Sequence, residues 1–288
     1  MKDIMKYFTD KNLEITEEDM KEILEKAEKV FEKEPNVVKK DFEQVLVVGD
    51  LHGFCNSAKF AFELVNKYLK DKKTGILFLG DYVDRGPVMI EVLYAVLWFK
   101  LKYPDRVIVL RGNHETDPIN RRYGFYEKMT WNYGEDMYNF AEQVFSKMPI
   151  AALINNEAFA CHGGLPKDLK KIEQLDDINR FVLDPIDDPI FLQLLWNDPR
   201  DIDTDFEPNW RGEGLYYFGP NAYKRFKEEN GIKYMFRAHE AVPSGIVFHF
   251  DKTLVTVFTA EYPNVTPAVL LFNKNGTFKE FYYNMDKN

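Results

Sequence analysis

Five short apolar runs in this sequence each lead directly into a cluster of polar residues of the types that bind metals or phosphate. The runs are Val45–Val48, Ile76–Leu79, Val107–Leu110, Ala158–Cys161 and Tyr234–Phe236. Runs of this kind are typical of buried strands, and the ligands of open α/β sheets gather at the carboxyl ends of the strands. The five polar clusters are therefore expected to converge on one place.

The pattern around these runs predicts two packed sheets with helices outside them, an α/β (α+β) fold. Strands are predicted at 43–48, 75–80 and 106–111, separated by helices at 57–70 and 88–102. This spacing is typical of βαβ units and favours a parallel sheet in the first half. The remaining predicted helices are 16–31, 117–128, 134–147 and 188–196, and the remaining strands are 150–154, 157–162, 232–238, 245–250, 254–260, 267–273 and 277–282. The rest of 176–214 is predicted to be mostly loop.

Charge and composition exclude several classes of protein. The formal net charge is −9, so a general nucleic-acid surface is not expected. The two cysteines are too few for a disulfide framework, which favours a cytoplasmic location. The first twenty residues lack the apolar core of a signal peptide, and the longest apolar stretch, Val92–Phe99, is too short to span a bilayer, so no membrane partner is expected.

Histidines are concentrated in the polar clusters. The chain has five histidines, and four of them lie there: His52, His114, His162 and His239. Asp50 and His52 are two residues apart at a strand end, so their side chains project to the same side and suit a divalent ion in a mixed oxygen and nitrogen site. Asp81, after the next strand, is placed to reach the same ion and to bridge to a second one.

Three further residues would complete the shell of the second ion: Asn113, His162 and His239. Two divalent ions carry +4 and the carboxylates of Asp50 and Asp81 carry −2, which leaves about +2 at the site. This charge suits a phosphate dianion. Two neighbouring divalent ions also lower the pKa of bound water and hold the attacking and leaving oxygens of an in-line displacement.

Residues beside these ligands are suited to acid catalysis and to phosphate binding. His114 is a candidate general acid for a leaving alkoxide, and Asp84 is a candidate partner that orients it. Arg85 can present a fork of donors to phosphate oxygens. The neighbouring charged residues have structural interpretations: Glu115 and Glu240 as hydrogen-bond acceptors, Arg111 and Arg237 as braces, and the acidic loop 198–207 as a solvated face.

The clusters, taken in order, resemble the motifs of the phosphoprotein phosphatase family, within the calcineurin-like metallophosphoesterase superfamily. The motifs are Gly49-Asp50-Leu51-His52-Gly53, Gly80-Asp81-Tyr82-Val83-Asp84-Arg85-Gly86, Gly112-Asn113-His114-Glu115, His162-Gly163-Gly164 and Arg237-Ala238-His239. Segments 119–126 and 195–199 resemble further parts of the family. One such motif is weak evidence, but five in order at compatible spacing are strong evidence. The similarity covers roughly residues 43–262.

This resemblance implies a role for each matching residue. One metal ion would be held by Asp50, His52 and Asp81, and the other by Asp81, Asn113, His162 and His239. His114 and Asp84 would form the acid pair, while Arg85 and Asn113 would contact the substrate. Arg211, in the segment Asn209-Trp210-Arg211-Gly212, would be a second phosphate-binding arginine. The implied fold has four layers, a central β-sandwich of two mixed sheets flanked by helices.

One loop departs from the family pattern. The family has a Ser-Ala-Pro-Asn-Tyr type of loop after a late strand, and this chain has Thr259-Ala260-Glu261-Tyr262-Pro263-Asn264 in its place. Tyr262 is the residue of this loop that has both a ring and a hydroxyl to offer a substrate. We therefore place Tyr262 among the substrate-binding residues.

The resulting prediction is a metal-dependent protein serine/threonine phosphatase in which a hydroxide that bridges two metal ions attacks phosphorus directly. Residues 1–42 are predicted to form a helical segment packed on a catalytic domain at 43–288, in a single domain overall. Manganese is the ion expected first, with iron, zinc, cobalt and magnesium as alternatives. Phosphorylated proteins or peptides are the expected partners. Two other functions stay open: a small-molecule phosphatase, such as a dinucleoside tetraphosphatase, and a catalytically silent phosphate-binding scaffold. The sequence leaves open the physiological substrate, phosphotyrosine activity, regulatory subunits, oligomeric state and inhibitor sensitivity.

Overall fold

The predicted strands of the first half form a sheet around three parallel strands. The computed structural model describes residues 4–8 and 14–284. Its five-stranded sheet has the order β14-β13-β2-β3-β4, where β2, β3 and β4 run parallel and β13 pairs antiparallel with both β2 and β14. The strands are β2 (Gln44–Val48), β3 (Thr74–Phe78), β4 (Val107–Val109), β13 (Ala268–Asn273) and β14 (Phe278–Tyr282). The sheet is therefore mixed, with its parallel part in the first half of the chain as predicted.

A six-stranded sheet packs against the first one. Its order is β1-β5-β6-β10-β12-β11, and β10 lies parallel to both β6 and β12. The strands are β1 (Val37–Lys40), β5 (Ala151–Ile154), β6 (Ala158–Cys161), β10 (Tyr234–Arg237), β11 (Ile246–His249) and β12 (Leu254–Val257). Both sheets therefore have parallel strands whose carboxyl ends can carry a shared site.

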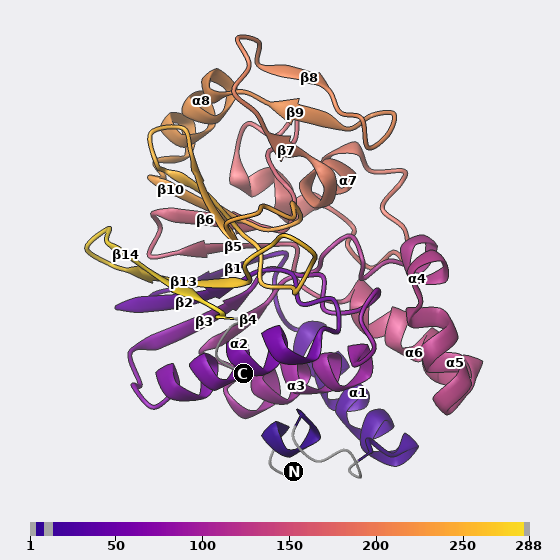
Figure 1. The fold of residues 1–288 in the computed structure, drawn as a ribbon. Coiled ribbons are helices and arrows are strands. Elements are labelled where there is room, and N and C mark those ends of the chain that lie inside the picture. Colours follow the sequence, from indigo (N-terminus) through magenta and orange to yellow (C-terminus); the bar gives the residue numbers. More distant parts are fainter. Residues whose placement is uncertain (1–3, 9–13, 285–288) are drawn as a thin grey trace.

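Successive side chains of a strand point to opposite faces of its sheet, so they contribute to two different parts of the core. Val45 and Val47 pack between the two sheets, whereas Leu46 and Val48 face the helices on the outside of the five-stranded sheet. That outer face is covered by α1 (Glu17–Phe31), α2 (Cys55–Tyr68), α3 (Met89–Lys102), α5 (Phe125–Tyr133) and α6 (Glu135–Ser146). The outer face of the other sheet is covered by η2 (Ile172–Asp177), α7 (Pro189–Trp196) and α8 (Pro220–Asn230). Figure 1 shows these helices on opposite sides of the sheets, which confirms the predicted four-layer fold.

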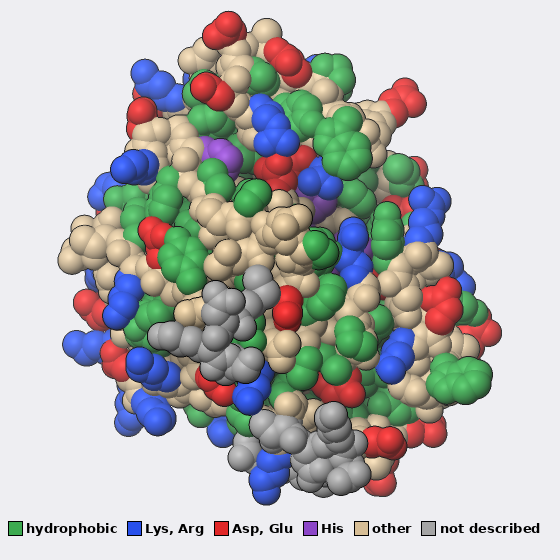
Figure 2. All heavy atoms as spheres, in the orientation of Figure 1, with side chains coloured by type: hydrophobic (Ala, Val, Ile, Leu, Met, Phe, Trp, Pro, Cys, Tyr) green, Lys and Arg blue, Asp and Glu red, His purple; other side chains and the backbone are tan. Residues whose placement is uncertain are grey.

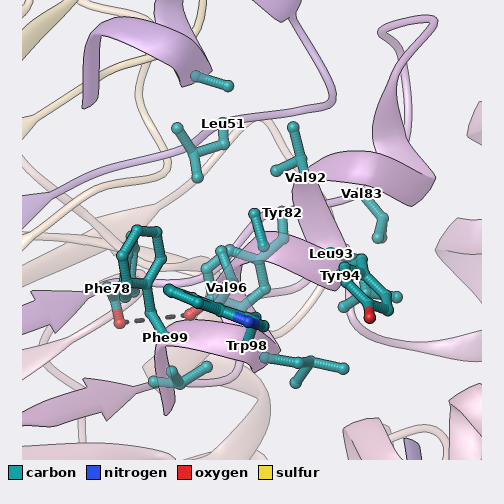
Figure 3. Close-up of a cluster of buried hydrophobic side chains, with 14 of the residues drawn as sticks. Leu51, Phe78, Tyr82, Val83, Val92, Leu93, Tyr94, Val96, Trp98 and Phe99 are labelled. Atoms are coloured by element: carbon teal, nitrogen blue, oxygen red, sulfur yellow. Dashed lines mark hydrogen bonds between the residues drawn. The ribbon is translucent and has the colours of Figure 1, made fainter. Parts of the chain in front are cut away.

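The core beneath β3 fixes the loop that follows it. Tyr82 is fully buried, and its hydroxyl donates to the carbonyl oxygens of Leu110 at 2.6 Å and Phe78 at 3.3 Å. Figure 3 shows its ring among buried side chains of α3, and the ring centroid of Phe78 lies 6.3 Å away. Because Asp81 precedes Tyr82 in the chain, this packing holds a predicted metal ligand from behind.

The N-terminal segment contributes more than helix. A short helix, η1 (Ile4–Phe8), precedes α1, and α1 packs against α3 and α6. The sequence predicts no strand before residue 43, yet β1 forms an edge of the six-stranded sheet beside β5. Half of this four-residue strand is lysine, Lys39 and Lys40, which is typical of edge strands and hides the apolar pattern.

Three other predictions differ from the structure. The single helix predicted at 117–128 is two helices, α4 (Asp117–Tyr123) and α5, because Gly124 adopts a left-handed φ of 111° between them. The loop predicted over 176–214 contains two strands of a small sheet with the order β7-β9-β8, made of β7 (Asp198–Pro199), β8 (Phe206–Pro208) and β9 (Tyr216–Phe218). Helix α8 is missing from the prediction, since only three of its eleven residues are buried.

Within residues 4–8 and 14–284, no helix combines the length and the apolar character needed to cross a membrane.

Candidate metal centre

Six predicted ligands come together at the carboxyl ends of strands from both sheets. Asp50 and His52 follow β2, Asp81 follows β3, Asn113 follows β4, His162 follows β6 and His239 follows β10. All six are buried. His52, Asp81 and His239 have left-handed φ values of 46°, 60° and 68°. Such values are uncommon outside glycine and are often found where a functional site demands a particular side-chain direction.

Asp81 lies at the centre of the cluster. Its Oδ2 is 3.5 Å from Nε2 of His52, and its Oδ1 is 3.3 Å from Nε2 of His162. Two groups of buried residues with ligand atoms within 4.8 Å of one another share Asp81; they are His52, Asp81 and His114, and Asp81, His162 and His239. The carboxylate thus has one oxygen on each side, as a residue that bridges two ions requires.

The histidine tautomers favour metal binding. Nδ1 of His52 is 2.9 Å from the carbonyl oxygen of Val83, and Nδ1 of His162 is 2.9 Å from that of Leu79. Each Nδ1 therefore carries the proton and donates it, which leaves Nε2 as an acceptor. Nε2 of His162 lies 2.9 Å from Oδ1 of Asn113 and close to the Asp81 carboxylate. Lone pairs that meet in this way need a cation between them.

Two buried polar atoms of the cluster also lack a protein partner. Within the described residues, no hydrogen bond reaches Oδ2 of Asp50 or Nε2 of His239, although Oδ1 of Asp50 accepts from the backbone N–H of His239 at 2.9 Å. Burial, and after it the charge of Asp81, raises the pKa of Asp50 to about 7. Burial also raises the pKa of Asp81 to about 7. The residues present therefore fit divalent cations, which would compensate both carboxylates.

The imidazoles around the carboxylates are held in the neutral form that ligates metals. Burial is the main cause that lowers the pKa of His52, His162 and His239. A neutral imidazole presents a lone pair to a metal, whereas a protonated one cannot.

His114 lies next to this cluster and is held by Asp84. Nδ1 of His114 is 2.6 Å from Oδ2 of Asp84, and its backbone N–H donates to Oδ1 of Asp81 at 2.9 Å. Asp84 in turn accepts from the side chain of Asn120 and from the backbone N–H of Phe125, both at 2.9 Å. Asn120, which has no predicted role, also donates to the carbonyl oxygen of His114. Its place within the segment that resembles the family, 119–126, was the available signal.

The pKa values of His114 and Asp84 are shifted in opposite directions. Burial, followed by the charge of Arg85, lowers the pKa of His114, whereas burial raises the pKa of Asp84 to about 7. His114 is also close enough to His52 and Asp81 to count as a possible ligand. Its Nδ1 is engaged by Asp84 and its Nε2 lies 3.4 Å from Nη2 of Arg85, contacts that are compatible with the predicted role as an acid.

The two predicted phosphate-binding arginines line the same cleft as the metal ligands. The guanidinium of Arg85 lies 4.7 Å from the ring centroid of Tyr123. Arg211 reaches the cleft from the segment between β8 and β9, and its Nε donates to Oδ2 of Asp198 at 2.6 Å. The structure thus brings Arg211 beside residues that are more than a hundred positions away in the chain.

Asp198 lies beside the site, and the prediction that it belongs to a solvated face is wrong. Residues 198–207 were interpreted as a solvated face, but Asp198 is fully buried and also accepts from Arg237 at 2.8 Å. Burial raises the pKa of Asp198, but the charges of Arg237 and Arg211 outweigh it and leave this pKa below its usual value. The carboxylate therefore holds both arginines in place.

Glu115 is the hydrogen-bond acceptor that the sequence predicted. Its carboxylate accepts from the backbone N–H groups of Asp81 and Tyr82, both at 2.8 Å, and of Gly112 at 2.9 Å. These three hydrogen bonds connect the loop after β3 to the loop after β4. A Cβ on Gly112 would lie 2.2 Å from Oδ1 of Asp81, so only glycine fits this close approach.

Arg111, Glu240 and His249 make structural contacts outside the ligand cluster. Arg111 donates to three backbone carbonyls, those of Glu115, Arg180 and Leu183, and so braces the loop as predicted. Glu240 pairs with Arg237 and Arg200, which confirms it as an acceptor. His249, the one histidine outside the polar clusters, is half-buried, and its Nε2 lies 3.0 Å from Oγ1 of Thr256.

Tyr262 packs against a metal-ligand candidate. Its ring is stacked on that of His52, with centroids 5.8 Å apart and an angle of 19° between the planes. Phe54 and Phe258 pack against the same ring. The altered loop therefore still brings a tyrosine to the site, where its ring covers one side of His52.

The site opens into a cleft of about 570 Å³. Figure 2 shows acidic, histidine and basic side chains meeting in a hollow in the upper half of the molecule. A larger groove, of about 1110 Å³, lies between α8 and the end of β11 with the turn that follows it, but none of the predicted ligands lines it. The chemistry is concentrated in the smaller cleft.

Comparisons with known proteins agree with this geometry. Residues 44–243 match the family described as calcineurin-like phosphoesterase. The structure is similar to that of a protein serine/threonine phosphatase from Saccharomyces cerevisiae with similarity to human phosphatase PP5, at 29% identity and a TM-score of 0.84, over 95% of this chain and 92% of that chain.

A second solved structure shares the fold. It is the cold-active protein-tyrosine phosphatase of a psychrophile, Shewanella sp., with 15% identity and a TM-score of 0.60 over 88% of this chain and 84% of that chain. At this identity the likeness concerns the fold alone.

Proposed function

The chain belongs to the calcineurin-like phosphoesterase family, and from this premise we propose that it is a metal-dependent phosphatase for phosphoserine and phosphothreonine in proteins. The observation that carries the proposal is the position of Asp81 between two sets of ligands, with one carboxylate oxygen toward each. The similarity to the yeast serine/threonine phosphatase, which extends over 95% of this chain, supports the protein substrate.

The proposed ligand sets follow the geometry around Asp81. Asp50, His52 and Asp81 would hold one divalent ion, and Asp81 with Asn113, His162 and His239 would hold the other. Ions bound there would act as a Lewis acid toward the phosphoryl group and would lower the pKa of a bound water. Manganese suits this mixture of carboxylate, amide and imidazole ligands, as do iron, zinc and cobalt.

The protein's own side chains have two tasks in this proposal. Arg85 and Arg211, both at the cleft, bind the non-bridging oxygens of the phosphate through charge-assisted hydrogen bonds. His114 gives a proton to the departing serine or threonine oxygen, and Asp84, 2.6 Å from its Nδ1, orients the ring and stabilises its protonated form. Since burial and Arg85 lower the pKa of His114, the phosphate dianion itself is expected to favour protonation when substrate binds.

The test is phosphate release before and after metal exchange. The protein is stripped with a chelator and refilled with manganese, iron, zinc, cobalt or magnesium. It is then assayed on phosphoserine, phosphothreonine and phosphotyrosine peptides and on diadenosine tetraphosphate. We expect no turnover by the stripped protein and recovery on phosphoserine and phosphothreonine peptides after refilling.

Three outcomes contradict the proposal. Full activity without metal would exclude the two-ion site. Turnover of diadenosine tetraphosphate alone would indicate a small-molecule phosphatase. Stoichiometric metal binding without turnover of any substrate would indicate a phosphate-binding scaffold.

A further inference from the structure

Arginines outnumber free carboxylates around the cleft. Four of them line it: Arg85, Arg122, Arg200 and Arg211. Apart from the metal-ligand candidates Asp50 and Asp81, the one carboxylate in this lining is Glu240, which pairs with Arg200 at 2.8 Å and with Arg237 at 3.2 Å. Although the chain has a formal net charge of −9, the lining of this cleft is a local concentration of positive charge.

Three of these arginines already have a partner within the site. Arg85 lies against His114, Arg200 against Glu240 and Arg211 against Asp198. Arg122 differs from them: in the part of the chain that the structure describes, it makes no ion pair, side-chain hydrogen bond or ring contact, and it is exposed. Its guanidinium is therefore free to bind a group that arrives from outside the protein.

Helix α4 presents Arg122 to the cleft and its neighbour Arg121 elsewhere. Ile119, Arg122 and Tyr123 all line the cleft, and their spacing of three and four residues places them on one face of the helix. Arg121 is instead neutralised by Asp117, with its Nε 2.9 and 3.0 Å from the two carboxylate oxygens, and it lies over the ring of Tyr126. The two adjacent arginines therefore allow a direct comparison between a charge that is already paired and a charge that faces the cleft.

Arg122 is close to the groups that handle the phosphate. The ring of Tyr123, the next residue, lies 5.2 Å from the ring of His114 and 4.7 Å from the guanidinium of Arg85. Successive residues of a peptide are about 3.8 Å apart. A side chain one or two positions from a phosphorylated residue thus reaches the α4 wall while the phosphate occupies the metal centre.

We propose that Arg122 is a specificity-determining residue that binds a second anionic group of the substrate, close in sequence to the phosphorylated serine or threonine. This inference rests on the proposed protein phosphatase function. The anionic group is a carboxylate of aspartate or glutamate or another phosphate, because both accept charge-assisted hydrogen bonds from a guanidinium.

The test compares three phosphopeptides that differ only beside the phosphoserine: one with alanine there, one with glutamate and one with a second phosphoserine. The value of kcat/KM is measured for the metal-loaded wild type and for Arg122→Gln, Arg122→Glu, Arg122→Lys and the matched control Arg121→Gln. The wild type is expected to prefer the anionic peptides by roughly three- to tenfold, the range of a partly exposed ion pair strengthened by a cleft.

Each variant has a distinct expected ratio of kcat/KM on an anionic peptide to kcat/KM on the alanine peptide. Arg122→Gln should bring the ratio to about one, Arg122→Glu should bring it below one, and Arg122→Lys should keep part of the preference. Arg121→Gln should keep the wild-type ratio, since that charge is already paired with Asp117. Added salt should lower the wild-type ratio and leave that of Arg122→Gln unchanged. The glutamate and diphosphorylated peptides show which anion Arg122 prefers.

Several outcomes would overturn the inference. An unchanged ratio in Arg122→Gln, or an equal loss on all three peptides, would make Arg122 a merely structural residue. Equal turnover of the three peptides by the wild type would refute the role of Arg122 and leave the phosphatase function intact. Failure of the wild type to act on any of them, with release of phosphate from an aryl phosphate, would refute both proposals.

Discussion

His114 is held by two neighbours with different effects on its proton. Asp84, 2.6 Å from Nδ1, stabilises a protonated ring, while Arg85, 3.4 Å from Nε2, opposes it. This leaves Nε2 pointing toward the arginine that would hold the substrate phosphate. In the proposed mechanism, a proton on Nε2 would lie toward the leaving oxygen once the phosphate dianion neutralises Arg85.

We predict that His114→Asn slows hydrolysis of a phosphoserine peptide by about 10²–10⁴-fold, because an alkoxide leaves poorly without a proton. Hydrolysis of an aryl phosphate should fall much less, since a phenolate leaves without help. Steady-state kinetics on both substrates, with metal content measured by elemental analysis, check this. Equal losses on both, or a loss of metal, would instead make His114 a ligand, as its proximity to His52 and Asp81 allows.

Helix α6 carries a buried acid, Glu142, close to Arg111 and Tyr138. Glu142 is 1% exposed, and neither of its carboxylate oxygens has a partner among the described residues. The hydroxyl of Tyr138 on the same helix donates to Asp117 instead, and the guanidinium donors of Arg111 go to backbone carbonyls. Burial, opposed by the charge of Arg111, raises the pKa of Glu142 from 4.5 to about 8.

We predict from this shift that α6 is held less firmly as the pH rises. The folded pKa lies above the unfolded one, so the stabilisation is fully present below about pH 4.5 and is lost as the pH rises through about 8. Glu142→Gln should remove this loss, and at pH 9 it should be more stable than the wild type by about 1–3 kcal/mol. Denaturant unfolding of the metal-loaded proteins between pH 5 and 9 measures this difference in the free energy of unfolding.

The exposed helical residue Glu25 provides the control for α6. Glu25→Gln should follow the wild-type pH profile. A steeper loss of stability for Glu142→Gln at high pH would show that the carboxylate is ionised and held by Arg111.

The candidate metal centre depends on the whole molecule because its proposed ligands come from both sheets. The five-stranded sheet carries Asp50, His52, Asp81 and Asn113 on its loops, and the six-stranded sheet carries His162 and His239. Ions bound there would tie the two layers together at one edge of the sandwich. Binding to the folded state alone stabilises it by about 2.7 kcal/mol when the free ligand is at a hundred times its Kd.

We therefore predict that chelation lowers the thermal unfolding midpoint and that added divalent metal raises it in a concentration-dependent way. Asp81→Asn should abolish this dependence and remove both ions together, since one carboxylate serves both ligand sets. Calorimetry with elemental analysis checks both statements. The exposed Asp187→Asn serves as the control and should behave as the wild type. A midpoint that does not respond to metal, or loss of a single ion from Asp81→Asn, would contradict the bridging role.

The sequence by itself determined the family and the fold class, and it predicted where the candidate ligands lie. Each motif follows an apolar run, and within each sheet the parallel strands that these runs form end at one edge, so strand direction gathers the motifs of that sheet. The packing of the two sheets then brings the two groups of motifs together. The fold and the family are confirmed. The roles of the site residues, the identity and number of the ions, the cytoplasmic location and the single-domain division stay predictions.

Only the tertiary structure decided the contacts made by residues that have no local pattern. Asp198 looks like the first of several solvated acids, and its burial depends on Arg237 and Arg211, which arrive from other elements. The strands β7, β8 and β9 have only two or three residues each, too few to leave a periodic pattern, and α8 buries only three of its eleven residues. Arg121 and Arg122 are the same residue type side by side, and only the direction of α4 separates a neutralised arginine from one that faces the cleft. Periodicity gives the face of an element, but the partner of a charged side chain depends on which distant segments the fold brings beside it.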